Sequence, residues 1–152
     1  MKWLLFFHAL GAIIWLGGSI YIEGLMAGAA RTKDPRTIMR TAQRVIETNK
    51  TLFIVGPLLV LVFGTWLTID LWGFREGFEQ IWVSLSLLLT LVGIGLGIFF
   101  FVPKGKEFEG LVAERGLEDD EAVALGRRIG SMGHVSTLVI FVVFILMIFQ
   151  PG

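Results

Sequence analysis

Four long apolar runs constrain this chain more than any other feature of its sequence. Each run holds about 20 residues, which is the length that a helix needs to cross roughly 30 Å of hydrocarbon. Because lipid offers no hydrogen-bond partner to an open backbone, we expect each run to be helical. The runs cover residues 3–22, 52–72, 81–102 and 132–149. The sequence therefore predicts an all-α bundle of four transmembrane helices, forming a single integral membrane domain over residues 1–152.

The composition agrees with a lipid bilayer as the surroundings of the chain and excludes several kinds of site. Hydrophobic residues make up 55% of the chain and charged residues 17%, against about 45–50% and about 25% in soluble domains. The chain has no cysteine, which excludes disulfides, cysteine-ligated zinc and iron–sulfur clusters. Only Lys2 precedes the first run, which is longer than a signal-peptide core, so we expect it to remain as a span. No nucleic-acid partner is expected.

Positive charges are distributed unevenly between the segments that connect the runs. Eleven of the 13 Lys and Arg residues follow the first or the third run. They are Arg31, Lys33, Arg36, Arg40, Arg44, Lys50, Lys104, Lys106, Arg115, Arg127 and Arg128. By the positive-inside rule, the first and third connecting segments are expected in the cytoplasm and both termini outside.

The first connecting segment predicts a cytoplasmic amphipathic surface helix between the first two spans. Asp34 and Pro35 suit the N-cap and the first helical turn. Apolar residues then recur at helical spacing, namely Ile38, Met39, Ala42, Val45 and Ile46. Arg36, Arg40 and Arg44 follow one another at steps of four on another ridge, where we expect them to face anionic lipid headgroups. A site for an anionic substrate is the alternative.

The third connecting segment predicts a solvated helix that leads into the fourth span. Four consecutive acids, residues 118–121, precede Arg127 and Arg128 by about two turns. Acids at a helix N-terminus complement the helix dipole. Consecutive residues point to different faces of a helix, so we interpret the four acids as a helix start rather than a metal site.

Glycines recur four residues apart within or beside the spans, which is a spacing typical of close helix packing. The pairs are Gly24 and Gly28, Gly93 and Gly97, and Gly126 and Gly130. Glycines that line a flat cofactor are the alternative interpretation.

The two histidines are the residues of the spans most suited to cofactor chemistry. His8 is expected ~7–8 Å below the outer end of the first span, and His134 near the cytoplasmic end of the fourth. A separation in depth of ~15–20 Å disfavours one haem held by both imidazoles. For each histidine a simpler role competes with cofactor binding: a hydrogen bond to a carbonyl for His8, and a place among headgroups for His134.

Small residues and a tryptophan share a helix face with His8. They are Gly11, Ala12, Trp15, Gly18 and Ser19. Small residues leave room for a planar ring on which Trp15 stacks, although the same face is also suited to packing against another helix. His8, Gly11, Trp15 and His134 are therefore the candidate cofactor-binding residues.

The motifs of this chain resemble those of the CopD/HemJ-like four-helix membrane proteins. "LLFFHALGAIIWLGGSIYIEGL" is similar to the first span of that group, in which a histidine precedes an apolar stretch ending in Trp-x-Gly-Gly. The segment "VGPLLVLVFGTWLT", the Pro-Lys step after the third run and the terminal "MIFQPG" extend the likeness, which is closest to a branch of predicted integral membrane proteins. The resemblance implies haem b and protoporphyrinogen oxidation in HemJ-type relatives, and copper handling in CopD-type relatives. It matches His8 to the histidine implicated in haem binding.

On this basis we predict a haem b-binding membrane redox protein in which His8 is an axial ligand of the haem iron. A protoporphyrinogen oxidase-like activity is the sharper form of this hypothesis. The contrasting hypothesis is a non-catalytic subunit or assembly factor of a larger membrane complex, and copper handling or transport is the third. A homodimer that shares a cofactor is a further alternative, because two-fold pairing is the commonest assembly.

Overall fold

Residues 1–49 and 52–150, which this computed structural model describes, form helices and no strand. The helices are α1 (Lys2–Arg31), α2 (Pro35–Asn49), α3 (Leu52–Trp72), α4 (Phe74–Glu79), α5 (Ile81–Leu96), a π-helical turn η1 (Gly97–Phe101), α6 (Val102–Arg115) and α7 (Asp120–Phe149). Within the described residues, four stretches are long and apolar enough to cross a membrane: Lys2–Arg31, Ile54–Trp72, Ile81–Arg115 and Asp120–Phe149. The predicted all-α fold is confirmed. Lys50, counted above among the basic residues, and residues 151–152 lie outside the described part.

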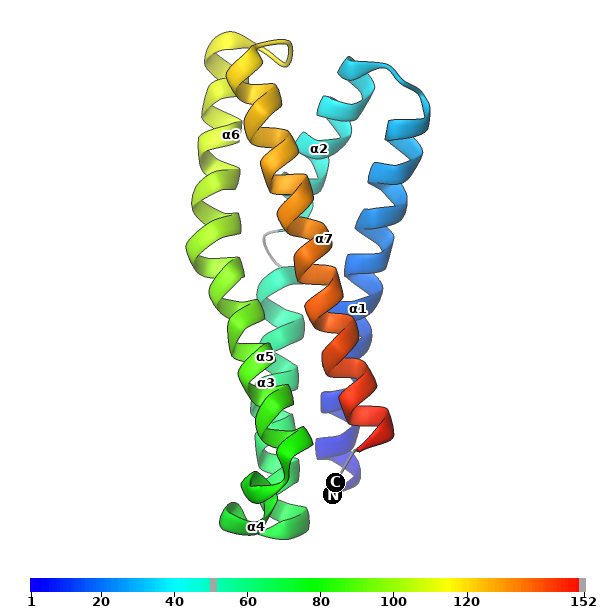
Figure 1. Ribbon diagram of the computed structural model, residues 1–152, viewed down its shortest axis with the longest axis vertical. Coiled ribbons are helices and arrows are strands. Elements are labelled where there is room, and N and C mark those ends of the chain that lie inside the picture. The colour runs from blue at the N-terminus through cyan, green and yellow to red at the C-terminus, as the bar shows by residue number, and fades with distance from the viewer. Residues whose placement is uncertain (50–51, 151–152) are drawn as a thin grey trace.

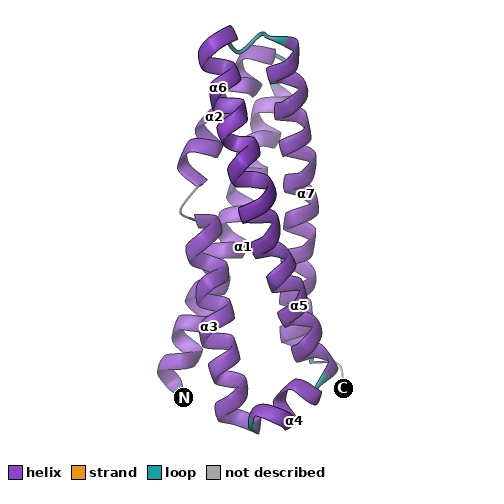
Figure 2. Cartoon of the chain, turned by 90° about the vertical axis from the view of Figure 1, so that its left-hand side faces the viewer, coloured by secondary structure: helices purple, strands orange, loops and turns teal. Residues whose placement is uncertain are grey.

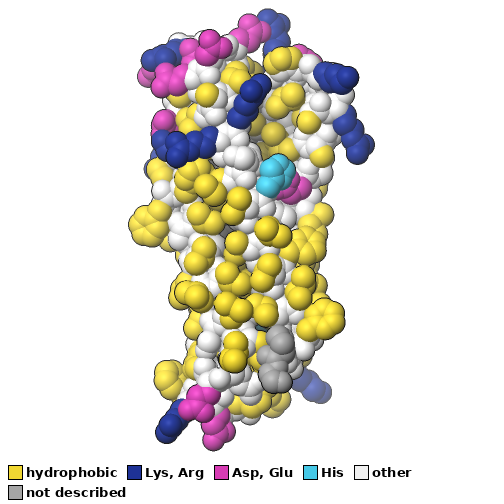
Figure 3. All heavy atoms as spheres, in the orientation of Figure 1, with side chains coloured by type: hydrophobic (Ala, Val, Ile, Leu, Met, Phe, Trp, Pro, Cys, Tyr) yellow, Lys and Arg dark blue, Asp and Glu magenta, His cyan; other side chains and the backbone are white. Residues whose placement is uncertain are grey.

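The long helices run side by side, and the two ends of the bundle differ sharply in character (Figures 1 and 2). The start of α1, the end of α7 and the short helix α4 lie at one end, while α2, α6 and the start of α7 lie at the other (Figure 1). A broad apolar band separates the ends, and most charged side chains visible on this face gather beside α2 and α6 (Figure 3). We call the end that carries α4 the cavity end, and the end that carries α2 and α6 the charged end.

The third membrane helix continues past the point where its predicted span ends. Pro103 has no N–H group to donate, and its ring crowds the carbonyl four residues earlier in an ordinary α-helix. The preceding turn is widened to a π-helix, in which the Val102 N–H donates to the Gly97 carbonyl. This wider turn accommodates the proline, so one continuous helical run carries the chain from Ile81 to Arg115.

The amphipathic helix predicted in the first connecting segment is present as α2, and Asp34 caps it. The Asp34 carboxylate accepts hydrogen bonds from the N–H groups of Arg36, at 3.2 Å, and Thr37, at 3.1 Å. Its apolar stripe, however, does not face a membrane surface. Met39 and Ala42 are buried in a cluster with Phe108, Ala122 and Leu125. The helix is amphipathic as predicted, but α6 and α7 extend beyond the apolar band and cover its apolar stripe.

The start of α7 follows the sequence prediction. Asp119 is the N-cap, and its Oδ1 accepts hydrogen bonds from the N–H groups of Glu121 and Ala122 at 3.1 Å each. The neighbouring acids pair with arginines: Glu118 with Arg36, and Glu121 with Arg115. The acidic run therefore serves as a helix start and as a partner for basic side chains.

Within the apolar band, α1 lies against α3 at two glycines. A Cβ atom added at Gly11 would lie 2.6 Å from the Leu59 Cβ, and one added at Gly56 would lie 2.9 Å from the Trp15 Cβ. The Trp15 ring reaches α5, where it would come within 2.8 Å of a Cβ at Gly93. Only glycine permits these approaches without displacing a neighbour.

The predicted glycine pairs differ in their surroundings. Gly93 faces Trp15, and Gly126 faces Phe108 and Met39. A Cβ added at Gly24, Gly28 or Gly130 would meet nothing within 4 Å among the described residues. The four-residue spacing alone therefore does not distinguish a packed glycine from an open one.

Candidate functional site

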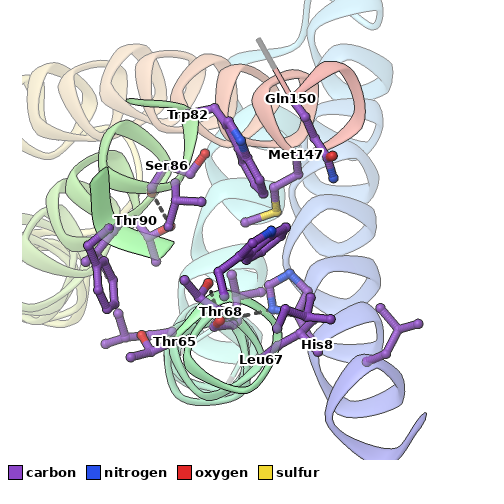
Figure 4. A pocket seen from close by; sticks show the side chains of 18 residues that line it. His8, Thr65, Leu67, Thr68, Trp82, Ser86, Thr90, Met147 and Gln150 are labelled. Carbon is purple, nitrogen blue, oxygen red and sulfur yellow. Dashed lines mark hydrogen bonds between the residues drawn. The ribbon is translucent and has the colours of Figure 1, made fainter. Parts of the chain in front are cut away.

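A cavity of about 290 Å³ lies at the cavity end, between α1, α3, α4, α5 and α7. Its polar lining is His8, Thr65, Thr68, Ser86, Thr90 and Gln150, and large apolar side chains, among them Trp72, Phe78, Trp82 and Met147, complete its walls (Figure 4). The lining residues Leu5, Leu71 and Gln150 are exposed, so the cavity opens to the surroundings beside them.

The His8 imidazole is held by two features of α3. Its Nδ1 lies 3.2 Å from the Val60 carbonyl oxygen. The ring rests on Gly64, where an added Cβ would lie 2.8 Å from the imidazole Cε1 and 2.9 Å from Nδ1. In the neutral tautomer that this contact favours, the Nδ1–H donates to Val60 and the lone pair of Nε2 is available. A metal-ligating histidine usually has this arrangement, with its other ring nitrogen fixed by a carbonyl.

The opposite wall of the cavity carries a buried hydroxyl group. On this wall, formed by α5, the Thr90 hydroxyl donates to the Ser86 carbonyl at 2.8 Å. On α3, the helix that holds His8 in place, the Thr68 hydroxyl donates to the Gly64 carbonyl at 2.9 Å. The Ser86 hydroxyl is buried and has no hydrogen-bond partner among the described residues, and it lies across the cavity from His8 (Figure 4). A buried hydroxyl without a partner costs about 1–3 kcal/mol. Ser86 is therefore suited to bind a polar group of a molecule in the cavity.

Met147 contributes a thioether to the same cavity from the last turns of α7. The side chain also packs against a cluster formed by Trp15, Val60 and Ile140. The cavity thus combines an imidazole from the first membrane helix with a thioether from the last.

Of the four predicted site residues, only His8 is among the described residues that line this cavity. Gly11 lies against α3, and Trp15, which is 4% exposed, lies between Gly56 and Gly93. The face that they share with His8 is therefore the face that packs against other helices.

His134 lies apart from the cavity and pairs with a carboxylate of α1. Its Nδ1 is 2.7 Å from the Glu23 Oε2, and the imidazole is 72% exposed. The Thr137 hydroxyl contacts the other oxygen of Glu23 at 3.2 Å. This three-residue cluster connects α1 to α7 and does not share a ligand site with His8 among the described residues.

Among the described residues that line the cavity, His8 is the one that the sequence predicted as a site residue, and Val60, Gly64, Ser86 and Met147 are among those that it did not. Gly64 lies in the segment "VGPLLVLVFGTWLT", which the sequence offers only as a family likeness. Its role follows from the contact with His8, which lies 56 positions earlier in the chain. Neither Ser86 nor Met147 has a neighbour in the sequence that identifies it as a cavity residue.

Comparison with known proteins gives one match. A family model described as "predicted integral membrane protein (DUF2269)" matches residues 2–151. No curated protein and no solved structure matches the chain. The match spans almost the whole chain and includes every residue named above as lining the cavity.

Proposed function

We propose that this chain, which belongs to the DUF2269 family of integral membrane proteins, is a membrane redox protein that binds haem b in the His8 cavity. The observation that carries this proposal is the orientation of His8, whose Nδ1 is fixed on the Val60 carbonyl while Nε2 is available as a ligand. The likeness of the first span to HemJ-type proteins supports the same role for this histidine. A protoporphyrinogen oxidase-like activity is the sharper form of the proposal.

The side chains of the cavity fit a haem by their chemistry. Imidazole is a common axial ligand of haem iron, and a thioether is a common second one, so His8 and Met147 are the ligands that we assign. The buried Ser86 hydroxyl is suited to a polar substituent of the ring. A volume of about 290 Å³ lies at the lower limit of ligand sites, which span about 300–1,000 Å³. We therefore expect part of the ring to occupy the open side beside Leu5 and Leu71.

The residues around His8 have distinct roles in this proposal. Gly64 leaves space for the imidazole, and the Val60 carbonyl sets its orientation. Trp72, Phe78 and Trp82 cover the cavity with large rings and limit the entry of water. When bound, haem supplies one-electron chemistry, and the protein sets its potential by ligands, burial and hydrogen bonds.

An absorption spectrum of the detergent-purified protein, oxidised and then reduced with dithionite, tests the proposal. We expect a Soret band with sharp reduced α and β bands that is lost in His8→Ala. The matched control is His134→Ala, which removes the only other histidine of the chain and should leave the bands unchanged. A colourless protein from haem-replete cells, or a spectrum that His8→Ala does not alter, would contradict the proposal.

Copper handling is the second candidate, and one observation favours it. His8 and Met147 line the same cavity, and imidazole and thioether ligands suit Cu(I). Metal analysis of the same preparations separates the two candidates. Copper bound in proportion to the protein and lost in both His8→Ala and Met147→Ala would favour copper over haem.

Orientation and assembly are part of the same proposal. We place the charged end in the cytoplasm and both termini outside, because the Lys and Arg residues gather at the charged end. Of the three arginines on the α2 ridge, we assign Arg44 to anionic headgroups, because it lies on the part of α2 nearer the apolar band.

Co-purification of other chains with a colourless protein would favour a subunit or assembly factor instead. A homodimer sharing haem would give one haem per two chains.

A further inference from the structure

The charged end holds a second concave site, far from the His8 cavity. A cleft of about 240 Å³ lies between α2 and the turn that joins α6 to α7, lined by Arg36, Arg40, Arg115, Gly116, Leu117 and Glu118. We propose that this cleft binds a soluble anion carrying one or two phosphate groups. This inference does not depend on the cofactor at His8.

Three arginines and one carboxylate are among the residues that line the cleft. Arg36 pairs with Glu118, and the Arg115 Nη1 lies 2.7 Å from the Glu121 Oε2, so both side chains are already oriented. The Arg40 side chain has no hydrogen bond or ion pair among the described residues. A guanidinium group binds phosphate oxygens through two parallel N–H donors, which makes arginine the preferred side chain for such ligands.

The packing beneath the cleft fixes the positions of these arginines. Arg36 and Arg40 are one turn apart on α2, and the adjoining apolar stripe of this helix is held in the buried cluster of Met39, Ala42 and Phe108. Arg115 is the last residue of α6, and Gly116 follows it with a φ of +90°, a conformation that favours glycine. The turn therefore brings Arg115 and Glu118 to the start of α2, although they are about 80 positions later in the sequence.

The position of the cleft argues for a soluble anion rather than a lipid headgroup. Glu23 is the first charged residue of α1 after Lys2, and the helix continues for eight more residues to Arg31, or about 12 Å at 1.5 Å per residue. The start of α2 and the α6–α7 turn lie at this far end (Figure 1). The α6–α7 turn and the start of α2 therefore lie about 12 Å beyond the level of Glu23, more than a Debye length of about 8 Å at physiological salt, and Arg40 lies about one turn nearer to it.

Glu118 competes with the proposed ligand for Arg36. The carboxylate lies within the cleft and pairs with that guanidinium, and a bound phosphate would take its place. Removing the negative charge of Glu118 should therefore strengthen binding, whereas removing the Arg40 guanidinium should weaken it without breaking a side-chain hydrogen bond or ion pair among the described residues.

Titration calorimetry of the whole protein in nanodiscs of neutral phosphatidylcholine tests this proposal, with inorganic pyrophosphate as the probe. We expect saturable binding that weakens by about tenfold or more in Arg40→Gln and tightens several-fold in Glu118→Gln. Arg44→Gln is the matched control, since it lies one turn further along α2, outside the cleft, and should not alter binding. Thermal unfolding of each variant verifies that it is folded.

Three results would overturn the proposal. The first is the absence of saturable binding by the folded protein. The second is an equal loss in Arg40→Gln and Arg44→Gln, which would indicate a general effect of positive charge. The third is loss of pyrophosphate binding in nanodiscs that contain anionic phosphatidylglycerol at equal ionic strength, which would identify a lipid headgroup as the occupant.

Discussion

The two ends of this protein are held together by different kinds of contact. At the charged end, large side chains bury one another: Phe108 is 0% exposed and Met39 is 5% exposed. Within the apolar band, α1 and α3 approach at Gly11 and Gly56. Removal of apolar surface from water stabilises the first arrangement. Lipid tails offer no such gain between helices, so close approach of backbones at small residues stabilises the second.

The largest effect is expected from Phe108→Ala, which removes the centre of the charged-end cluster. Truncation of a fully buried phenylalanine typically lowers the free energy of unfolding by about 3–5 kcal/mol. We expect α2 and α6 to separate first, because Phe108 contacts the cluster that contains Met39 and Ala42. Thermal unfolding in detergent and hydrogen exchange of α2 measure the two effects.

Phe99→Ala is the control for that experiment. Phe99 is 83% exposed on the surface of the apolar band, so its truncation leaves no internal cavity. If Phe99→Ala lowered the melting temperature as much as Phe108→Ala does, burial at the charged end would not be what distinguishes the two regions.

The second effect is expected from Gly56→Ala, which tests the contact between α1 and α3. The new methyl group would lie 2.9 Å from the Trp15 Cβ and 3.0 Å from the Trp15 backbone nitrogen, neither of which moves freely. Such overpacking typically costs about 1–3 kcal/mol. Gly17→Ala is the control, since its methyl group meets nothing within 4 Å among the described residues. Equal melting temperatures of the two variants would show that the helices do not depend on this close approach.

Much of this architecture is predictable from the sequence, because apolar length and helical periodicity are local properties. The four membrane helices, the amphipathic helix after Asp34 and the acidic start of α7 all follow from such patterns. The partner of an apolar face is not a local property. The stripe of Met39 and Ala42 has the same periodicity whether lipid or Phe108 covers it, and only the tertiary arrangement decides between them.

The same limit applies to the candidate site. An imidazole within an apolar run identifies His8 from the sequence, because a polar group there needs a partner. Its contacts with Val60 and Gly64, and the shared cavity with Met147, depend on the relative positions of three helices. In the sequence, the helix face of Gly11 and Trp15 suits both a cofactor and packing against another helix, and in the structure it contacts α3 and α5.

Gly64→Ala should have a smaller effect on folding and a specific effect at the cavity end. Its methyl group would meet the imidazole of His8 at 2.8 Å, and a side chain yields more easily than a backbone. The proposed function predicts a weaker and shifted Soret band at nearly unchanged melting temperature. Gly95→Ala, whose methyl group meets nothing within 4 Å among the described residues, should leave the spectrum as it is. An unchanged spectrum in Gly64→Ala would mean that His8 does not need the space beside Gly64 to bind haem.

The smallest effect is expected at Asp34, which caps the start of α2 and whose contribution to stability depends on pH. The hydrogen bond from the Thr37 hydroxyl, at 2.5 Å, is the main cause that lowers the pKa of Asp34, and the N–H groups of Thr37 and Arg36 act in the same direction. Since the folded pKa lies below the unfolded one, this stabilisation is complete above the unfolded value of about 4. It is lost as the pH falls through the lower, folded pKa.

Asp34→Asn isolates this contribution, because asparagine also caps helices but does not titrate. We expect the melting temperature of the variant to lie slightly below that of the natural chain at pH 6, and the gap to close as the pH falls below about 4. The two proteins share every other carboxylate, so the difference between them reports on position 34. A gap that is unchanged at pH 3 would show that the ionised carboxylate does not stabilise α2. Attachment of that helix would then depend on the buried cluster around Phe108 rather than on its cap.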